Sequence, residues 1–297
     1  MSSIRVNPYP MPDLLAAMEN LQQEQDTTTL ELSTGSRINK PSDDPAGAAQ
    51  VAQMKDRSSQ VDSFQRSITG ISGLLSTADS TLNSVGTALQ RAISLGVEGA
   101  NGTLSDSDRN DIATELSGIQ NQLISLANAS YQGQYVFAGT ANTEPYVADA
   151  TQSSGVRYAG NSGINHVEIG TGYQLQVNLP GSQVFNASGA DVFQAIQDLI
   201  TSLNNNSGID TAVGEVTSAF NSVTAQRTFY GNAINQTQTQ QNELSTESLN
   251  LTQQQNAVAG ADMATIASQV ASDQTAMNAT LAAIGKMPQN SLFDYLH

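Results

Sequence analysis

The fold of this chain is decided by residues 61–92, VDSFQRSITGISGLLSTADSTLNSVGTALQRA. Within this stretch, apolar residues recur at alternating steps of three and four positions. The stripe consists of Val61, Phe64, Ile68, Ile71, Leu75, Ala78, Leu82, Val85, Leu89 and Ala92. Such a stripe stays on one side of an α-helix and packs against a partner helix. The stretch therefore predicts one long helix inside a bundle of helices.

Signals for helix ends lie on both sides of this stretch. Upstream, Asp44 can cap a helix and Pro45 suits the first helical position. Downstream, a series of spaced glycines that begins at Gly96 predicts the end of the helix. Ser105 and Asp108 then have the spacing of a capping box. The same apolar stripe continues behind them in Ile112, Leu116, Ile119, Leu123 and Leu126. We therefore expect a second helix that packs along the first.

From Gly133 to about Asn186 the apolar pattern changes to a period of two. Alternating stretches occupy residues 156–158, 166–169 and 175–179, and glycines separate them. Short alternating runs between glycines are typical of strands joined by hairpins. The sequence therefore predicts a small β domain inserted between helices.

Helical spacing returns behind the insert and runs through a second long helix. It starts with Val192, Ile196, Leu199 and Leu203 and continues with Val213, Val216, Phe220, Val223, Tyr230, Ile234, Leu244, Leu251 and Val258. Several positions of this seam are polar, namely Thr237, Gln241, Ser248 and Gln255. Two interpretations stay open for them: a weakly packed seam, or a buried hydrogen-bonded layer.

Both ends of the chain show amphipathic helical spacing without a core of their own. At the start it comprises Leu14, Met18, Leu21, Thr28 and Leu32, and at the end Met263, Ile266, Val270, Met277, Leu281 and Ile284. Isolated helices depend on packing for their stability. Each end therefore needs the other end or a neighbouring subunit, and we expect the ends to become ordered on assembly.

These patterns predict a mainly α protein with a β insert, of the α+β class. Residues 1–40 and 258–297 form the terminal amphipathic helices. Residues 41–135 and 187–257 form an elongated rod of long coiled-coil-like helices, and residues 136–186 form the β insert.

The composition excludes several classes of function. The chain has 297 residues, with Lys+Arg 11 and Asp+Glu 27, and its formal net charge is −16. A nucleic-acid-binding surface needs clustered Lys and Arg, so this class is excluded. The absence of cysteine removes disulfides, thiolate metal sites and cysteine nucleophiles. The first residues lack the apolar region of a secretory signal peptide, so we expect a cytosolic protein or export by another route.

Candidate catalytic and metal-binding residues are few. Of the two histidines, His166 lies in the β region and His297 is terminal, and no Gly-x-Ser-x-Gly motif accompanies them. Two acidic groups could be metal ligands: Asp43 with Asp44, and Asp106 with Asp108 and Asp111. They lack the glycine turn and closing Glu of a calcium loop, and helix capping explains them better. We expect no catalytic residue, no cofactor and no metal.

One segment carries a family resemblance. Residues 32–50, LSTGSRINKPSDDPAGAAQ, resemble the N-terminal signature of the bacterial flagellin superfamily. The matching residues are Leu32, Ser33, Gly35, Arg37, Ile38, Asn39, Asp43, Asp44, Ala46 and Gly47. Residues 261–264 and 291–296 are similar to the other end of that family. Two features resemble its hook–filament junction members: the start, residues 5–8, and a motif that contains Tyr135, Phe137, Gly139 and Pro145.

The resemblance implies a structural subunit of the extracellular flagellum that joins hook to filament. It implies export in an unfolded state through the flagellar type III apparatus. It places residues 1–40 and 258–297 in an inner coiled-coil layer and the β insert on the outside. The implied partners are further copies of the chain in a ring, another hook-associated protein on the hook side and flagellin on the filament side. No nucleic acid and no membrane is expected as a partner.

The resemblance also implies an export chaperone on the C-terminal helix. Its exposed apolar face would consist of Met263, Ile266, Val270, Met277, Leu281 and Ile284. Two other functions stay open: a subunit of the filament itself, and a type III secreted effector or translocator that shares only the helical ends.

Overall fold

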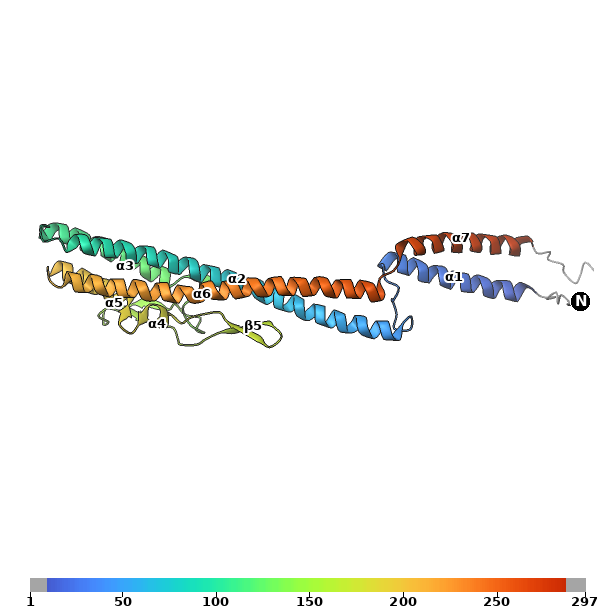
Figure 1. Ribbon diagram of the computed structural model, residues 1–297, viewed down its shortest axis with the longest axis horizontal. Helices are drawn as coiled ribbons and strands as arrows, with labels where there is room; N and C mark the ends of the chain where they lie inside the picture. The colour runs from blue at the N-terminus through green and yellow to red at the C-terminus, as the bar shows by residue number, and fades with distance from the viewer. Residues whose placement is uncertain (1–9, 287–297) are drawn as a thin grey trace, which may run out of the picture. The chain divides into compact units, whose positions relative to one another are not determined.

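The computed structural model describes residues 10–286, which divide into two compact units. The first unit contains residues 10–59 and 247–286, and the second contains residues 60–246. Two long helices, α2 (Pro45–Gly99) and α6 (Ile209–Ala259), contribute to both units (Figure 1). The expectations for residues 5–8 and 291–296 lie outside the described part of the chain. The prediction of a mainly helical protein is confirmed.

In the first unit, α1 (Pro10–Thr34) and α7 (Met263–Lys286) lie side by side (Figure 1). The seam of α1 follows the predicted stripe through Leu14, Met18 and Leu21, which are half-buried, to Thr28, which is buried. The prediction was wrong for Leu32, which is exposed. The half-buried Glu31 occupies the next seam position instead, because the stripe advances by three residues from Thr28.

In the second unit, α2 and α6 pack together with α3 (Asp106–Ala127) and α5 (Val192–Asn204). The predicted stripe of residues 61–92 is buried throughout, except for the half-buried Phe64. Leu75, for example, has no exposed surface, and burying such a side chain contributes about 1.5–3 kcal/mol. The stripes of α3 and α5 face the same core.

Helix α2 continues beyond the predicted end at Gly96 and stops at Gly99. Gly96 is a packing position, because a Cβ there would collide with Val213 of α6 and press on Leu199 of α5. A glycine inside a helix lets a neighbouring helix approach closely, so its presence alone does not mark a helix end.

The strands form separate hairpins rather than one sheet, and the first and last hairpins extend past the bounds of 136–186 expected for the insert. Four two-stranded antiparallel sheets form: β1 (Ser130–Tyr131) with β2 (Gln134–Tyr135), β3 (Tyr146–Ala148) with β4 (Val156–Tyr158), β5 (His166–Gly170) with β6 (Tyr173–Gln176), and β7 (Asn186–Ala187) with β8 (Ala190–Asp191). A one-turn helix, α4 (Gly181–Val184), lies between β6 and β7. Isolated two-stranded hairpins are marginal in water, so these depend on the aromatic residues and helices beneath them.

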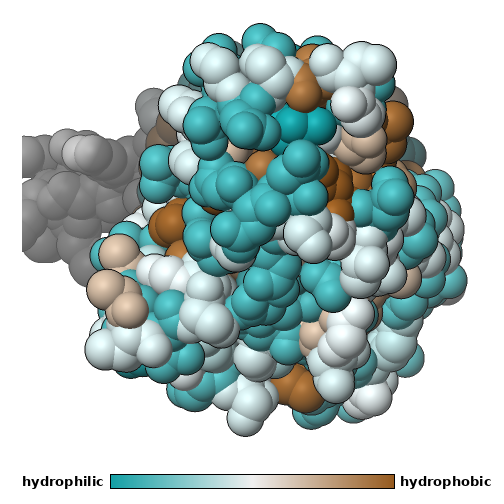
Figure 2. All heavy atoms as spheres, turned by 90° about the vertical axis from the view of Figure 1, so that its left-hand side faces the viewer, coloured by the Kyte–Doolittle hydropathy of each residue, from teal (hydrophilic) through white to brown (hydrophobic). Residues whose placement is uncertain are grey.

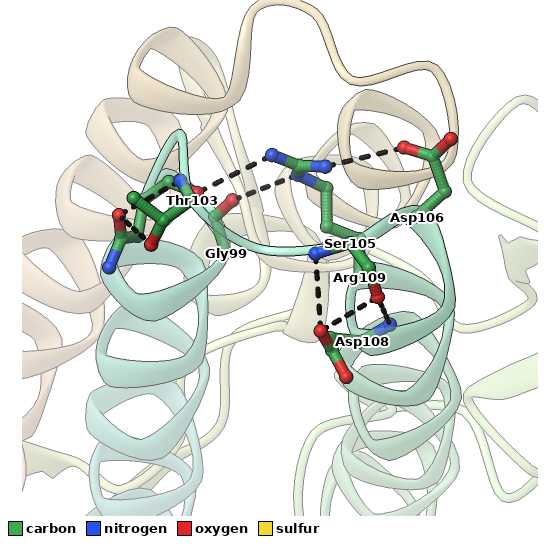
Figure 3. Close-up of polar contacts among 7 residues, drawn as sticks. Gly99, Thr103, Ser105, Asp106, Asp108 and Arg109 are labelled. Carbon is green, nitrogen blue, oxygen red and sulfur yellow. Dashed lines mark hydrogen bonds and ion pairs between the residues drawn. The ribbon is translucent and has the colours of Figure 1, made fainter.

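The turn from α2 to α3 confirms the predicted capping box (Figure 3). Ser105 Oγ accepts a hydrogen bond from Asp108 N at 3.2 Å, and Asp108 Oδ2 accepts one from Ser105 N at 3.1 Å. Beside it, the buried Arg109 donates to Gly99 O and Asn101 O, both at 3.4 Å, and to Asp106 Oδ1 at 3.3 Å. The guanidinium thus binds the end of α2 to the start of α3.

The surface at the end of the second unit that contains the α2–α3 turn is mostly hydrophilic, and its hydrophobic residues lie in separate patches (Figure 2). Among residues 10–286, no helix combines the length and the apolar character that crossing a membrane requires.

Candidate functional site

The signature residues lie at the end of α1, in the loop between α1 and α2 and at the start of α2. The loop lies beside the connection between α6 and α7. Gly35, at φ +67°, ends α1, and its N–H donates to Glu31 O at 2.8 Å. Gly35 O then accepts from Ala261 N at 3.0 Å, and Arg37 N donates to Ala259 O at 2.8 Å. An antiparallel bridge joins Ser36 and Gly260. The two connections are therefore hydrogen-bonded to each other, which fixes where α1 and α7 start their contact.

Arg37 joins the loop after α1 to the end of α6 and to the residue directly before α2. Its Nε donates to Val258 O of α6 at 2.9 Å. Its Nη2 forms an ion pair with Asp44 Oδ2 at 3.0 Å, directly before α2. Its backbone N–H is the donor to Ala259 O described above. A guanidinium can serve such a role because its donors point in several fixed directions.

Asp44 caps α2, as its position before Pro45 predicted. Its Oδ1 accepts from Gly47 N at 2.9 Å. The Gly47 N–H, and after it the Arg37 side chain, lower the pKa of the Asp44 carboxyl. An anionic carboxylate at this position also complements the helix dipole.

Asp43 closes the turn before the cap. Its Oδ2 accepts from Lys40 N at 2.7 Å and from Asn39 N at 3.0 Å, and these two bonds lower its pKa. Asn39 Nδ2 in turn donates to Ser36 O at 2.7 Å. Backbone amides therefore bind both carboxylates of the first acidic group that was considered as a metal site. In the described part of the chain, no group of three acidic or histidine side chains is placed to hold a metal ion.

The absence of a side chain at Gly47 lets Asp44 and Ile38 pack against its backbone. A Cβ on Gly47 would lie 2.5 Å from Asp44 Oδ2 and 2.6 Å from Ile38 Cδ1. Ala46, in contrast, is exposed. The structure thus brings Gly35, Arg37, Ile38, Asn39, Asp43, Asp44 and Gly47 into one compact loop, with Ala46 on its outside.

The second motif lies in the other unit and forms a core rather than a surface. Phe137 is fully buried against Phe185, with ring centroids 5.1 Å apart. Gly139 has φ +76°, and a side chain there would collide with Asn161. Pro145 is buried and its carbonyl accepts from Ala159 N at 2.7 Å, while Tyr135 is half-buried in β2.

Tyr146, which follows Pro145 in this motif, is central to this core. Its ring contacts those of Tyr158, Phe185 and Phe193. Its hydroxyl donates to Asn186 Oδ1 at 2.7 Å, and burial raises its pKa well above the usual value. Aromatic residues far apart in the sequence give no periodic signal, so this cluster could not be predicted.

The predicted apolar residues of α7 divide between two faces. Ile266 is buried and Val270, Met277 and Ile284 are half-buried, whereas Met263 and Leu281 are exposed at 47% and 50%. Sequence reasoning also missed Asp273, which is buried in this seam and accepts from Gln269 Nε2 at 2.9 Å and Thr28 Oγ1 at 3.4 Å. The six residues therefore do not form one continuous exposed face.

His166 begins β5 and is exposed. A small hollow beside it is lined by Ile71, Leu74 and Tyr131, among others. None of these residues supplies a nucleophile or an acid for a triad.

Comparison with known proteins identifies a family model and, among other relatives, two hook-associated proteins. The model of the bacterial flagellin N-terminal helical region matches residues 11–142. The flagellar hook-associated protein 3 of Salmonella typhimurium is 33% identical over 174 residues, which cover 58% of this chain and 54% of that protein. The flagellar hook-associated protein 3 of Escherichia coli is 27% identical over 290 residues, which cover 89% of this chain and 90% of that protein. This chain thus matches about half the length of the first relative and nearly all of the second.

A solved structure has the same fold. The crystal structure of the flagellar junction protein FlgL from Legionella pneumophila superposes with a TM-score of 0.61 at 16% identity. The superposition covers 71% of this chain and 100% of that chain. The likeness therefore extends beyond the N-terminal helices to most of the architecture.

Proposed function

Because the chain belongs to the flagellin family, we propose that it is a structural subunit of the bacterial flagellum that joins the hook to the filament. It acts as a building block and not as an enzyme, since its family consists of structural proteins. Its place is the extracellular flagellum, at the junction of hook and filament. The observation that carries this proposal is the similarity to a hook-associated protein over 89% of this chain and 90% of that protein.

The packing of the terminal helices supports a role in assembly. Among the described residues of α1 and α7, only Thr28, Ile266 and Asp273 are buried. The other seam residues, such as Leu21 and Met277, keep part of their apolar surface in water. Neighbouring copies in a ring would bury this surface, and burial of apolar surface drives association. The ends would thereby become fully stable only in the assembly.

We assign the regions of the chain to layers of that assembly. Residues 1–40 and 258–297 form the inner layer, the helices of about residues 41–131 and 210–257 form the next layer, and the β insert of residues 136–186 faces outward. The signature loop would lie where the inner layer meets the next one, and its network around Arg37 supports such a role. On the hook side the partner is another hook-associated protein, and on the filament side it is flagellin.

Before assembly, an export chaperone would bind residues 258–297. Ile266, Val270, Met277 and Ile284 share the face of α7 that α1 covers. The chaperone and α1 would therefore compete for the same face, which would keep the ends apart during export. Met263 and Leu281 would add contacts at its margin.

Immunogold electron microscopy tests the proposed location. An antibody against residues 141–190 recognises the β insert, which we expect on the outside of the flagellum. On intact cells, we expect gold in a short band where the hook meets the filament. A strain without the gene for this chain provides the control and should show no gold.

Two other patterns would contradict the proposal. Gold along the whole filament would identify a filament subunit. Signal in the medium only, with unlabelled flagella, would favour a secreted effector or translocator.

A further inference from the structure

In the second unit, charged residues are so rare on α2 and α6 that few ion pairs between the two helices are available. Arg227 is the single basic residue in the sequence of α6, and Asp79 is the single acidic residue between positions 63 and 97 of α2. In the structure these two side chains meet. Arg227 Nε lies 2.8 Å from Asp79 Oδ1, and Arg227 Nη2 lies 3.2 Å from Asp79 Oδ2.

A third contact extends this pair along α2. Arg227 Nη1 donates to Asn83 Oδ1 at 2.8 Å, one helical turn beyond Asp79. Each of the three guanidinium nitrogens thus has an acceptor on α2. A planar guanidinium that binds a carboxylate through two bonds has a strict geometric requirement, so a small displacement of either helix breaks the arrangement.

Apart from the close approach of Val213 to Gly96, the repeating apolar seam between these helices has no comparable requirement. On α2, Ile, Leu, Val and Ala recur with the same spacing over more than four heptads. A shift of seven residues would again place apolar side chains against apolar ones. No short turn joins the two helices either, since residues 100–208 lie between them.

A shift of one heptad would destroy the ion pair in either direction. The helices run antiparallel, because Arg227 meets Asp79 while Phe220 lies nearest to Gly86. A shift by seven residues would bring Arg227 to the level of Ser72 or Gly86, neither of which carries a charge. Asp79 would then come to the level of an apolar residue, Phe220 or Ile234.

We propose that the contact of Arg227 with Asp79 and Asn83 sets the register in which α6 pairs with α2. The two charged side chains are 41% and 28% exposed, and ion pairs with this exposure add little to stability. Their effect is on specificity, because they favour one register over alternatives that the apolar seam accepts. The seam supplies the packing energy, and the ion pair selects the alignment.

Distance measurement by electron spin resonance tests this role. The chain contains no cysteine, so nitroxide labels can be attached at two introduced cysteines alone. Gln90→Cys on α2 and Ala225→Cys on α6 replace exposed residues. In the full-length chain with its native ion pair, we expect one distance between the labels. With Arg227→Leu, we expect a second population shifted by up to about 10 Å, since seven residues rise about 1.5 Å each.

Further variants distinguish a change in the register of α6 from a general loss of stability. Asp79→Asn keeps the shape of the side chain and removes its charge, and it should produce the same second population. The exchange of both residues, Asp79→Arg with Arg227→Asp, should restore one distance. The matched control is Arg91→Leu, which removes an ion pair of Arg91 with Glu115 at 2.7 Å across the α2–α3 turn. Arg91→Leu should leave a single distance between the two labels, because the short α2–α3 turn fixes the register of α3 without this ion pair.

Either of two results would overturn the proposal. One is a single unchanged distance in Asp79→Asn and Arg227→Leu with helical circular dichroism like that of the parent. The other is a second population that persists after the charge exchange.

Discussion

Two glycines of α2 differ in what surrounds them. A Cβ on Gly73 would collide with the ring of Tyr131, whereas Gly70 has nothing within 4 Å. Alanine is more favourable than glycine inside a helix by about 0.5–1 kcal/mol. Gly70→Ala should therefore raise the free energy of unfolding by about that amount, and Gly73→Ala should lower it because Tyr131 must move. Urea unfolding measures both, and equal effects would contradict the contact between Gly73 and Tyr131.

A charge in the helix seam should have a much larger effect. Leu75 has no exposed surface, and its neighbour Ser76 is exposed. Leu75→Asp should lower the free energy of unfolding by about 3–5 kcal/mol, because an unpaired carboxylate would be buried between helices. Ser76→Asp is the matched control and should change it by less than about 0.5 kcal/mol. A melting curve of Leu75→Asp like that of the parent would refute the packing of α2.

The carboxylates of the signature loop predict how stability depends on pH. The pKa values of Asp43 and Asp44 lie below the usual 3.8, because backbone N–H groups bind the charged forms. A group with a lowered pKa in the folded state stabilises the fold above its unfolded pKa, and this contribution disappears as pH falls through the folded pKa. The loop should therefore be fully stable above about pH 5 and weaken below about pH 4.

Thermal melting of the parent and of Asp44→Asn between pH 2.5 and pH 7 checks this prediction. The variant should melt at a lower temperature than the parent at neutral pH, and the difference should shrink as pH falls. A difference that is constant across this range would show that the charge of Asp44 does not stabilise the loop.

For whole elements, periodicity was a reliable guide where one face of a helix is buried along its length. The stripe of residues 61–92 predicted this part of α2 because each of its turns meets the core of the second unit. The β insert carried a weaker signal, since each strand is only two to five residues long. Alternation over so few residues predicts strands but not their partners, and separate hairpins could not be distinguished from one sheet.

In the candidate site too, the sequence predicted local interactions but not contacts between distant residues. Asp44 was predicted as a cap because capping is a local interaction. The bonds of Arg37 to Val258 and Ala259 join residues more than 220 positions apart, and no local pattern predicts such contacts. Arg109 and Asp273 were missed for a related reason: each is a charged residue that is buried by distant or irregular parts of the chain.

For the molecule as a whole, the division into two units determines what a deletion removes. Residues 60–246 contain the long-helix core and the β insert, whereas α1 and α7 belong to the other unit. Deletion of residues 258–297 removes α7 and the chain that Arg37 contacts at Val258 and Ala259. The contacts within residues 60–246 do not involve the deleted segment. The truncated chain should therefore retain a cooperative thermal transition of the second unit.

The same truncation should abolish assembly, because α1 would lose its partner and the inner layer could not form. Cells that carry only the truncated chain are expected to be non-motile, with hooks that lack filaments in electron micrographs. Ile266→Asp, which places a charge in the α1–α7 seam, should weaken motility in the full-length chain, while Ser268→Asp at an exposed position should not. If truncated cells swim normally, the terminal helices are not required for the junction, and the structural role proposed for them is wrong.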